Sequence, residues 1–166
     1  MTDACDLTAL QARRMIGNKA LSPVELVDSC IARIEQVDPA LNAMVATCYD
    51  RARDEARTAE KAVMQGDYLG RLHGLPLGVK DLNVTEGVRT TFGSELHVDF
   101  VPARDERIIA DLRRAGAIVL GKTNTPEFGA GANTTNRVYG PTGNPFDPAR
   151  ICGGSSGGSA VALACG

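Results

Sequence analysis

The sequence has no tryptophan, and aromatic side chains make up only 4% of its 166 residues. It also lacks a block of like charge: the formal net charge is -2, and the longest runs of basic residues are the pairs Arg13-Arg14 and Arg113-Arg114. A surface for nucleic acid or for an anionic membrane needs clustered positive charge. We therefore expect no direct contact with nucleic acid, no membrane, and a small molecule as the partner.

Long hydrophobic runs are also absent. No apolar stretch is long enough to span a bilayer, and the first ten residues lack the basic and then apolar segments of a secretory signal. We expect a cytoplasmic protein. With 43% hydrophobic residues the chain can still bury a core, so it reads as one globular unit.

Ligands for metals are scarce. The histidines are His73 and His97, and no two cysteines form a C-x-x-C pair. The five cysteines are odd in number and widely spaced: Cys5, Cys30, Cys48, Cys152 and Cys165. This pattern is typical of neither a disulfide framework nor a zinc site. We expect reduced thiols, no metal and no cofactor.

Residues 1–70 have a mainly helical pattern. Ser22, Pro23 and Glu25 form a capping box with proline at the first helical position, which predicts a helix from there to about Asp38. Residues 41–49 look extended, and the alanine-rich stretch 50–66 predicts a second helix that ends at a glycine.

Residues 71–166 alternate between strand and helix patterns. Apolar runs at 75–83 and 117–125 predict buried strands, and residues 105–116 predict a helix between them with Ile108 and Leu112 on its apolar face. Strand, helix and strand in this order predict an α/β fold with a largely parallel or mixed sheet. A loop rich in proline and glycine, 139–159, then leads into another helix near Ser159.

Two short motifs suggest functions that their contexts oppose. The stretch "GAIVLGKT", residues 116–123, matches a phosphate-binding loop, but its Ala-Ile-Val-Leu core favours a buried strand over a tight turn. The stretch "GGSSG" matches a nucleophile elbow centred on Ser155 or Ser156. An elbow requires a preceding strand and a later histidine, whereas the residues before it read as loop and both histidines lie upstream.

Three segments taken together resemble the amidase signature family, whose members are serine hydrolases with a Ser-Ser-Lys triad. The segments are "GLPLGVKD", "GAIVLGKTNTPEFG" and "GPTGNPFDPARICGGSSGGSA", and the resemblance runs from about Ser22 to the end. It implies that Lys80 is the catalytic base, Ser155 the bridging serine and Ser156 a supporting residue, with a cis peptide at Gly154–Ser155. It also implies that Gly129, Ala130 and Gly131 line the substrate pocket, for which a simple tight turn is an equal alternative.

The residues themselves fit these roles. Lys80 closes an apolar run, so poor hydration should lower its pKa toward that of a usable base. The alternative is a lysine paired with Asp81 in solvent. Glycines around Ser155 allow close approach of the backbone, whereas a flexible linker is the alternative for this segment.

The resemblance implies hydrolysis of a carboxylic amide through an acyl-enzyme. It also implies that residues 1–166 are the N-terminal portion of a single amidase domain, with the sheet incomplete at the C-terminal end. In that case the attacking serine and the oxyanion hole lie further on, and the chain alone is inactive. The A subunit of a tRNA-dependent amidotransferase and a non-catalytic remnant are the alternatives, and a homodimer stays open.

Overall fold

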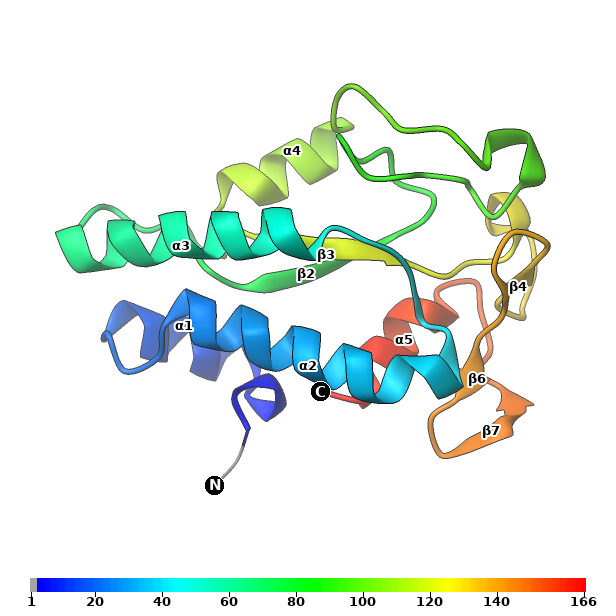
Figure 1. The fold of residues 1–166 in the computed structure, drawn as a ribbon, viewed down its shortest axis with the longest axis horizontal. Coiled ribbons are helices and arrows are strands. Elements are labelled where there is room, and N and C mark those ends of the chain that lie inside the picture. The colour runs from blue at the N-terminus through cyan, green and yellow to red at the C-terminus, as the bar shows by residue number, and fades with distance from the viewer. Residues whose placement is uncertain (1–2) are drawn as a thin grey trace.

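The structure is a computed structural model that describes residues 3–166, and it has a mixed α/β fold. Within these residues, a small sheet lies among five α-helices (Figure 1). The α-helices are α1 (Ala9–Gly17), α2 (Pro23–Leu41), α3 (Tyr49–Gln65), α4 (Arg107–Arg114) and α5 (Gly157–Ala164). Three short 3-10 helices are η1 (Ala4–Asp6), η2 (Glu95–His97) and η3 (Glu127–Gly129). Among the residues that the structure describes, no helix is long and apolar enough to cross a membrane.

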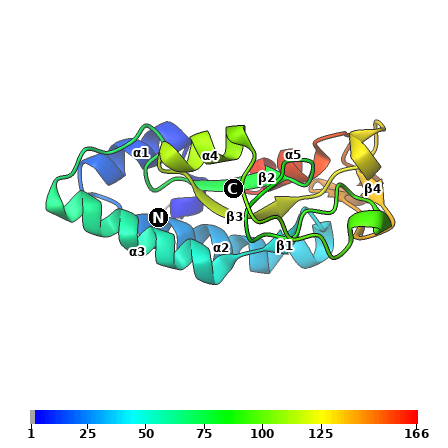
Figure 2. The same ribbon diagram turned by 90° about the horizontal axis from the view of Figure 1, so that it is seen from above.

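The predicted helical layer is present. Ser22 caps α2 with the expected capping box to Glu25, and α2 continues through Pro39 to Leu41. The alanine-rich helix α3 ends at Gly66, which is left-handed with φ 79. α2 and α3 run side by side (Figures 1 and 2), and the small alanine side chains of α3 allow it to pack closely on α2 and the sheet.

The main sheet has three strands, in the order β1, β3, β2. These strands are β1 (Met44–Thr47), β2 (Pro76–Lys80) and β3 (Ile118–Thr123). β2 runs parallel to the central β3, while β1 is antiparallel to it, so the predicted strand-helix-strand unit forms a mixed sheet. The register of β2 on β3 shifts between Leu77 and Gly78, which places Val79 opposite Lys122 and Lys80 opposite Thr123.

The two faces of β2 and β3 carry different helices. α4 lies above the strands and α5 below them in Figure 1. Ile109 of α4 packs against Val79 and Val119. On the other face, Ser159 of α5 contacts Thr123, with the two hydroxyl oxygens 2.7 Å apart. Val79 and Val119 therefore face α4, whereas Thr123 faces α5. The register shift of β2 on β3 breaks the strict alternation of side chains along β3, so that Val119 and Thr123 lie on opposite faces.

Three predictions of local structure need correction. The buried face of α4 contains Ile109, with 3% exposure, whereas Ile108 is 56% exposed.

The segment 139–159 is not a continuous loop, because it contains short strands that form two antiparallel ribbons with their neighbours. The strands within this segment are β5 (Gly140–Pro141), β6 (Gly143–Asn144) and β7 (Asp147–Ile151). β5 pairs with β4 (Thr135–Asn136), which lies just before the segment, and β6 pairs with β7. A strand therefore does precede the serine segment, although in the described part of the chain β7 pairs only with β6 and does not join the main sheet. The division of the chain near residue 70 stays a prediction.

Candidate active site

Lys80 is the last residue of β2, and its side chain reaches the paired serines at the start of α5. Its Nζ atom lies 2.9 Å from Ser155 Oγ and 2.9 Å from Ser156 Oγ, and donates to both. These contacts join residues that are 75 and 76 positions apart in the chain. The lysine and the two serines expected from the sequence thus meet in one cluster.

The surroundings of Lys80 favour its neutral form. Partial burial lowers the pKa of its ammonium group below the ordinary value of 10.5, as the sequence predicts. Among residues 3–166 no carboxylate forms an ion pair with it. The adjacent Asp81 is completely buried and accepts a hydrogen bond from the Thr91 hydroxyl, so the alternative of a solvent-exposed Lys80–Asp81 pair is wrong.

The backbone around Ser155 is held by two threonines. The Gly154–Ser155 peptide bond is cis, as the resemblance implies. The carbonyl of Ser155 accepts a hydrogen bond of 3.3 Å from Thr125 Oγ1. One residue before the cis bond, the carbonyl of Gly153 accepts hydrogen bonds from the amide and the hydroxyl of Thr134, at 3.0 and 2.8 Å. The loop is therefore anchored on both sides of the cis peptide.

The glycines after the serines permit close packing. A Cβ atom on Gly157 would lie 2.2 Å from Thr134 Oγ1, and one on Gly158 would lie 2.3 Å from the backbone nitrogen of Asn124. Ser156 is the N-cap of α5 but makes no capping hydrogen bond with its side chain, because its hydroxyl is directed to Lys80. Close packing against fixed neighbours argues against a flexible linker.

Sequence reasoning missed the polar residues that position this loop. Thr123, Asn124 and Thr125 are buried at the end of β3. The Asn124 carbonyl accepts a hydrogen bond of 3.3 Å from Gly158 N, while its side-chain amide donates to Thr142 Oγ1 at 2.9 Å. The detectable signal was a run of uncharged polar residues directly after a buried apolar strand.

The predicted substrate-lining segment lies beside Leu82, two residues after the end of β2. Gly129 has φ 72 and contacts Leu82 so closely that a Cβ atom would lie 2.6 Å from Leu82 Cδ1. Ala130 and Gly131 follow it and are exposed. The contact with Leu82 brings the segment near the chain that follows Lys80, and its role in binding substrate stays a prediction.

The competing motifs do not assemble into sites. Among residues 3–166, neither histidine forms a hydrogen bond with Ser155 or Ser156. His73 Nε2 lies 3.0 Å from the carbonyl oxygen of Ala59, and His97 packs against aromatic rings. The phosphate-loop match forms β3 instead of a tight turn, and every residue of that strand is buried.

The chain is thus an α/β protein in which a lysine at the end of a strand contacts two adjacent serines. The amidase family model matches residues 25–166, and the chain belongs to this family.

Similar proteins include both amidases and one component of an amidotransferase. The chain is 42% identical over 164 residues to the A subunit of the glutamyl-tRNA(Gln) amidotransferase of Anaeromyxobacter dehalogenans (strain 2CP-C). The matched region is 99% of this chain and 33% of that subunit. A solved bacterial aryl acylamidase of the amidase signature family is 36% identical with a TM-score of 0.87, over 93% of this chain and 32% of that one. A chain of a vestigial protein complex linked to the origins of an s-triazine catabolic enzyme is 36% identical with a TM-score of 0.91, over 96% and 35%. The chain thus spans about a third of the length of these relatives.

Proposed function

We propose that the protein to which this chain belongs hydrolyses the C–N bond of a carboxylic amide through an acyl-enzyme, with Lys80 as the base and Ser155 as the proton relay. The observation that carries the proposal is the position of Lys80, 2.9 Å from the Ser155 hydroxyl, at a site where burial lowers its pKa. No carboxylate in the described part of the chain forms an ion pair with it. A neutral amine in this place can accept a proton from a serine hydroxyl.

The proton moves through the cluster in a fixed order. Neutral Lys80 takes the Ser155 proton while Ser155 takes a proton from a second, attacking serine, whose oxygen bonds to the amide carbonyl carbon. The C–N bond then breaks, and the leaving nitrogen takes the proton back along the same path. The water oxygen next bonds to the acyl carbon while its proton passes through Ser155 to Lys80. The bond between the acyl carbon and the serine oxygen then breaks, the serine oxygen takes the proton back, and the acid is released. The match to this chain covers about a third of the relatives' length. We assign the attacking serine and the oxyanion donors to the rest of the domain that those relatives contain.

The substrate class is a small amide, and two kinds of protein use such chemistry. The similarity to the A subunit of a glutamyl-tRNA(Gln) amidotransferase favours a subunit of a complex that acts on that tRNA. The segment "TNTPEFG", with Thr125, Pro126 and Gly129, differs from the T-N-M-D-E-F-A type of segment that we expect in that protein. We therefore favour a stand-alone amidase, acting in the cytoplasm, and keep the amidotransferase as the second candidate.

The test is to express the protein from its complete gene and to measure amine or ammonia release from an aliphatic amide, an anilide and glutamine. Lys80→Met should abolish release, whereas Lys61→Met, which removes an exposed lysine on α3, should leave it unchanged. Release from glutamine that requires tRNA and partner proteins would identify the amidotransferase. No release from any of these amides would favour the non-catalytic remnant.

A fluorophosphonate probe distinguishes the relay from a nucleophile. The proposal expects the adduct on a serine other than Ser155 and Ser156. An adduct mapped by mass spectrometry to either of these two residues would show that the paired serines themselves attack.

A further inference from the structure

Lys122 and Asp81 form a buried ion pair on the face of the sheet opposite the serines. Both side chains are 0% exposed, and Lys122 Nζ lies 4.0 Å from Asp81 Oδ1. Asp81 directly follows Lys80, and Lys122 directly precedes Thr123, which is the partner of Lys80 in the sheet. Because neighbouring residues in a strand point to opposite faces, the pair and the Lys80 cluster share the same two strand ends but lie on different sides of them.

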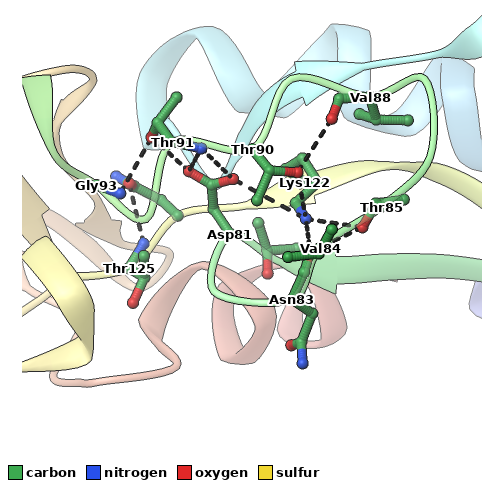
Figure 3. Close-up of polar contacts among 12 residues, drawn as sticks. Asp81, Asn83, Val84, Thr85, Val88, Thr90, Thr91, Gly93, Lys122 and Thr125 are labelled. Carbon is green, nitrogen blue, oxygen red and sulfur yellow. Dashed lines mark hydrogen bonds and ion pairs between the residues drawn. The ribbon is translucent and has the colours of Figure 1, made fainter. Parts of the chain in front are cut away.

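Lys122 and Asp81 form hydrogen bonds with several groups of the loop that follows Lys80 (Figure 3). Lys122 Nζ donates to the carbonyl of Asn83, to Thr85 Oγ1 at 2.8 Å and to Thr90 Oγ1 at 3.3 Å. The figure shows these groups converging on the ammonium of Lys122 from the loop. The chain between residues 83 and 90 is therefore tied to the central strand through one side chain.

Asp81 fixes the far end of the same loop. Its carboxylate accepts hydrogen bonds from the Thr91 amide at 3.1 and 3.2 Å and from the Thr91 hydroxyl at 2.6 Å. Its own amide donates to the Thr123 carbonyl at 3.0 Å, so the pairing of β2 with β3 continues one residue past Lys80. Lys80 thus has an immobilised residue on its C-terminal side.

The same strand, β3, also leads to the serine loop. Three residues after Lys122, Thr125 donates to the carbonyl of Ser155. The separation between Lys80 and Ser155 is therefore determined by how the end of β2 sits on the end of β3. Burial removes both charges from water, and the attraction between the two ions often does no more than offset that cost, so a buried ion pair contributes little to stability by itself.

We propose that Lys122 and Asp81 are positioning residues that hold Lys80 in line with Ser155 from the opposite face of the sheet. This inference rests on the proposed function for its meaning in catalysis. Neither residue touches the serines. Burial lowers the pKa of Lys122 to about 8, with the Asp81 carboxylate opposing the shift, as expected for an ammonium removed from water but still paired.

The experiment compares Lys122→Met, Asp81→Asn and the double variant Asp81→Asn/Lys122→Met with the wild type. The single Lys122→Met leaves a buried carboxylate without its partner and can fail to fold, whereas the double variant removes both charges together. For the double variant we expect a folded protein whose kcat on the amide falls at least about tenfold with KM unchanged, because substrate contacts remain while the base is misplaced. Lys61→Met is the matched control.

A second readout needs no substrate. The lysines of the chain are Lys19, Lys61, Lys80 and Lys122. With selective ¹³C-lysine labelling, an immobilised Lys80 gives two separate ε-proton shifts in an NMR correlation spectrum, and the exposed Lys61 gives one averaged shift. We expect the Lys80 pair to merge in the folded double variant.

The outcomes separate this inference from the proposed function. A folded double variant with wild-type kcat, or with an unchanged pair of Lys80 signals, would overturn the positioning role. If the wild type hydrolyses no amide but the Lys80 signals still merge, the proposed function fails and the positioning of Lys80 stands.

Discussion

At the scale of single residues, the proposed chemistry depends on one amine whose affinity for a proton is reduced by burial. Lys80 is only partly buried, and two hydroxyl groups are its polar partners. Desolvation penalises the charged form, and neither hydroxyl supplies the negative charge that would restore it. The residue can therefore exchange a proton with Ser155 at a lower pH than an exposed lysine could.

This shift predicts the pH dependence of the activity. Lys80 acts as a base only when it is neutral, so kcat/KM should rise with pH. The midpoint of this rise should lie below the ordinary lysine pKa of 10.5, and activity should be lost as the pH falls through the folded-state pKa of Lys80. Stability has the same sign: between the two pKa values the unfolded chain binds more protons, so the contribution of Lys80 to the free energy of unfolding increases with pH. Stopped assays of amine release across the range, with separate Tm measurements at each pH, check both. A midpoint at or above 10.5 would contradict the burial argument.

The two serines should differ in importance. Ser155 is half-buried and its backbone is held by Thr125, whereas Ser156 is exposed and offers Lys80 a second acceptor. We expect Ser155→Ala to lower kcat by about 100- to 10,000-fold, the range for loss of a positioned proton-transfer group. Ser156→Ala should cost about tenfold or less, since one hydrogen bond contributes about 1 kcal/mol. Kinetics of the two purified variants give the ranking, and the reverse order would make Ser156 the relay.

At the scale of elements, the position of the serine loop depends on how closely α5 approaches the end of β3. The first turn of α5 contains Gly157 and Gly158, both buried. Gly158 N donates to the carbonyl of Asn124, and its α-carbon faces the backbone of that residue. Helix and strand therefore touch through their backbones, which leaves no space for a side chain.

Gly158→Ala should separate these two elements. The new Cβ atom would lie 2.3 Å from Asn124 N and 2.8 Å from the carbonyl oxygen of Ala43, and backbone atoms cannot rotate away. We expect the free energy of unfolding to fall by about 1–3 kcal/mol, typical of overpacking, together with a loss of activity.

Gly17→Ala in α1 is the matched control, because its Cβ atom would meet only the flexible end of Arg13 at 3.1 Å. Denaturant unfolding of both variants measures the difference. Equal stability of the two variants would show that α5 tolerates displacement from β3.

Much of the element order was predictable from local patterns. The capping box at Ser22 and the left-handed Gly66 are local signals, so α2 begins, and α3 ends, where the sequence predicts. The face of α4 is different: Leu112 forms a helical stripe with either Ile108 or Ile109, and only the position of the sheet decides that Ile109 is the buried one. The short ribbons after β3 carry no periodic pattern, so the sequence could not predict them.

At the scale of the whole molecule, the candidate site joins parts that the sequence shows only separately. The Lys80 and Ser155 pairing came from the family resemblance, since periodicity does not reveal which loop meets which strand end. The ion pair of Asp81 with Lys122 was missed because the pattern suggested Asp81 as a partner of its neighbour Lys80, although adjacent strand residues face opposite ways. Contacts between distant segments decide these pairings, and they depend on how β2 sits on β3.

The most direct test of the central claim is the turnover of Lys80→Ala on a hydrolysed amide, measured in protein expressed from the complete gene. Far-UV circular dichroism and Tm must first show that the variant folds as the wild type does. Removal of one member of a triad that acts as a unit should lower kcat by at least about 1,000-fold. Turnover near the wild-type value in a normally folded Lys80→Ala protein would contradict the assignment of Lys80 as the base.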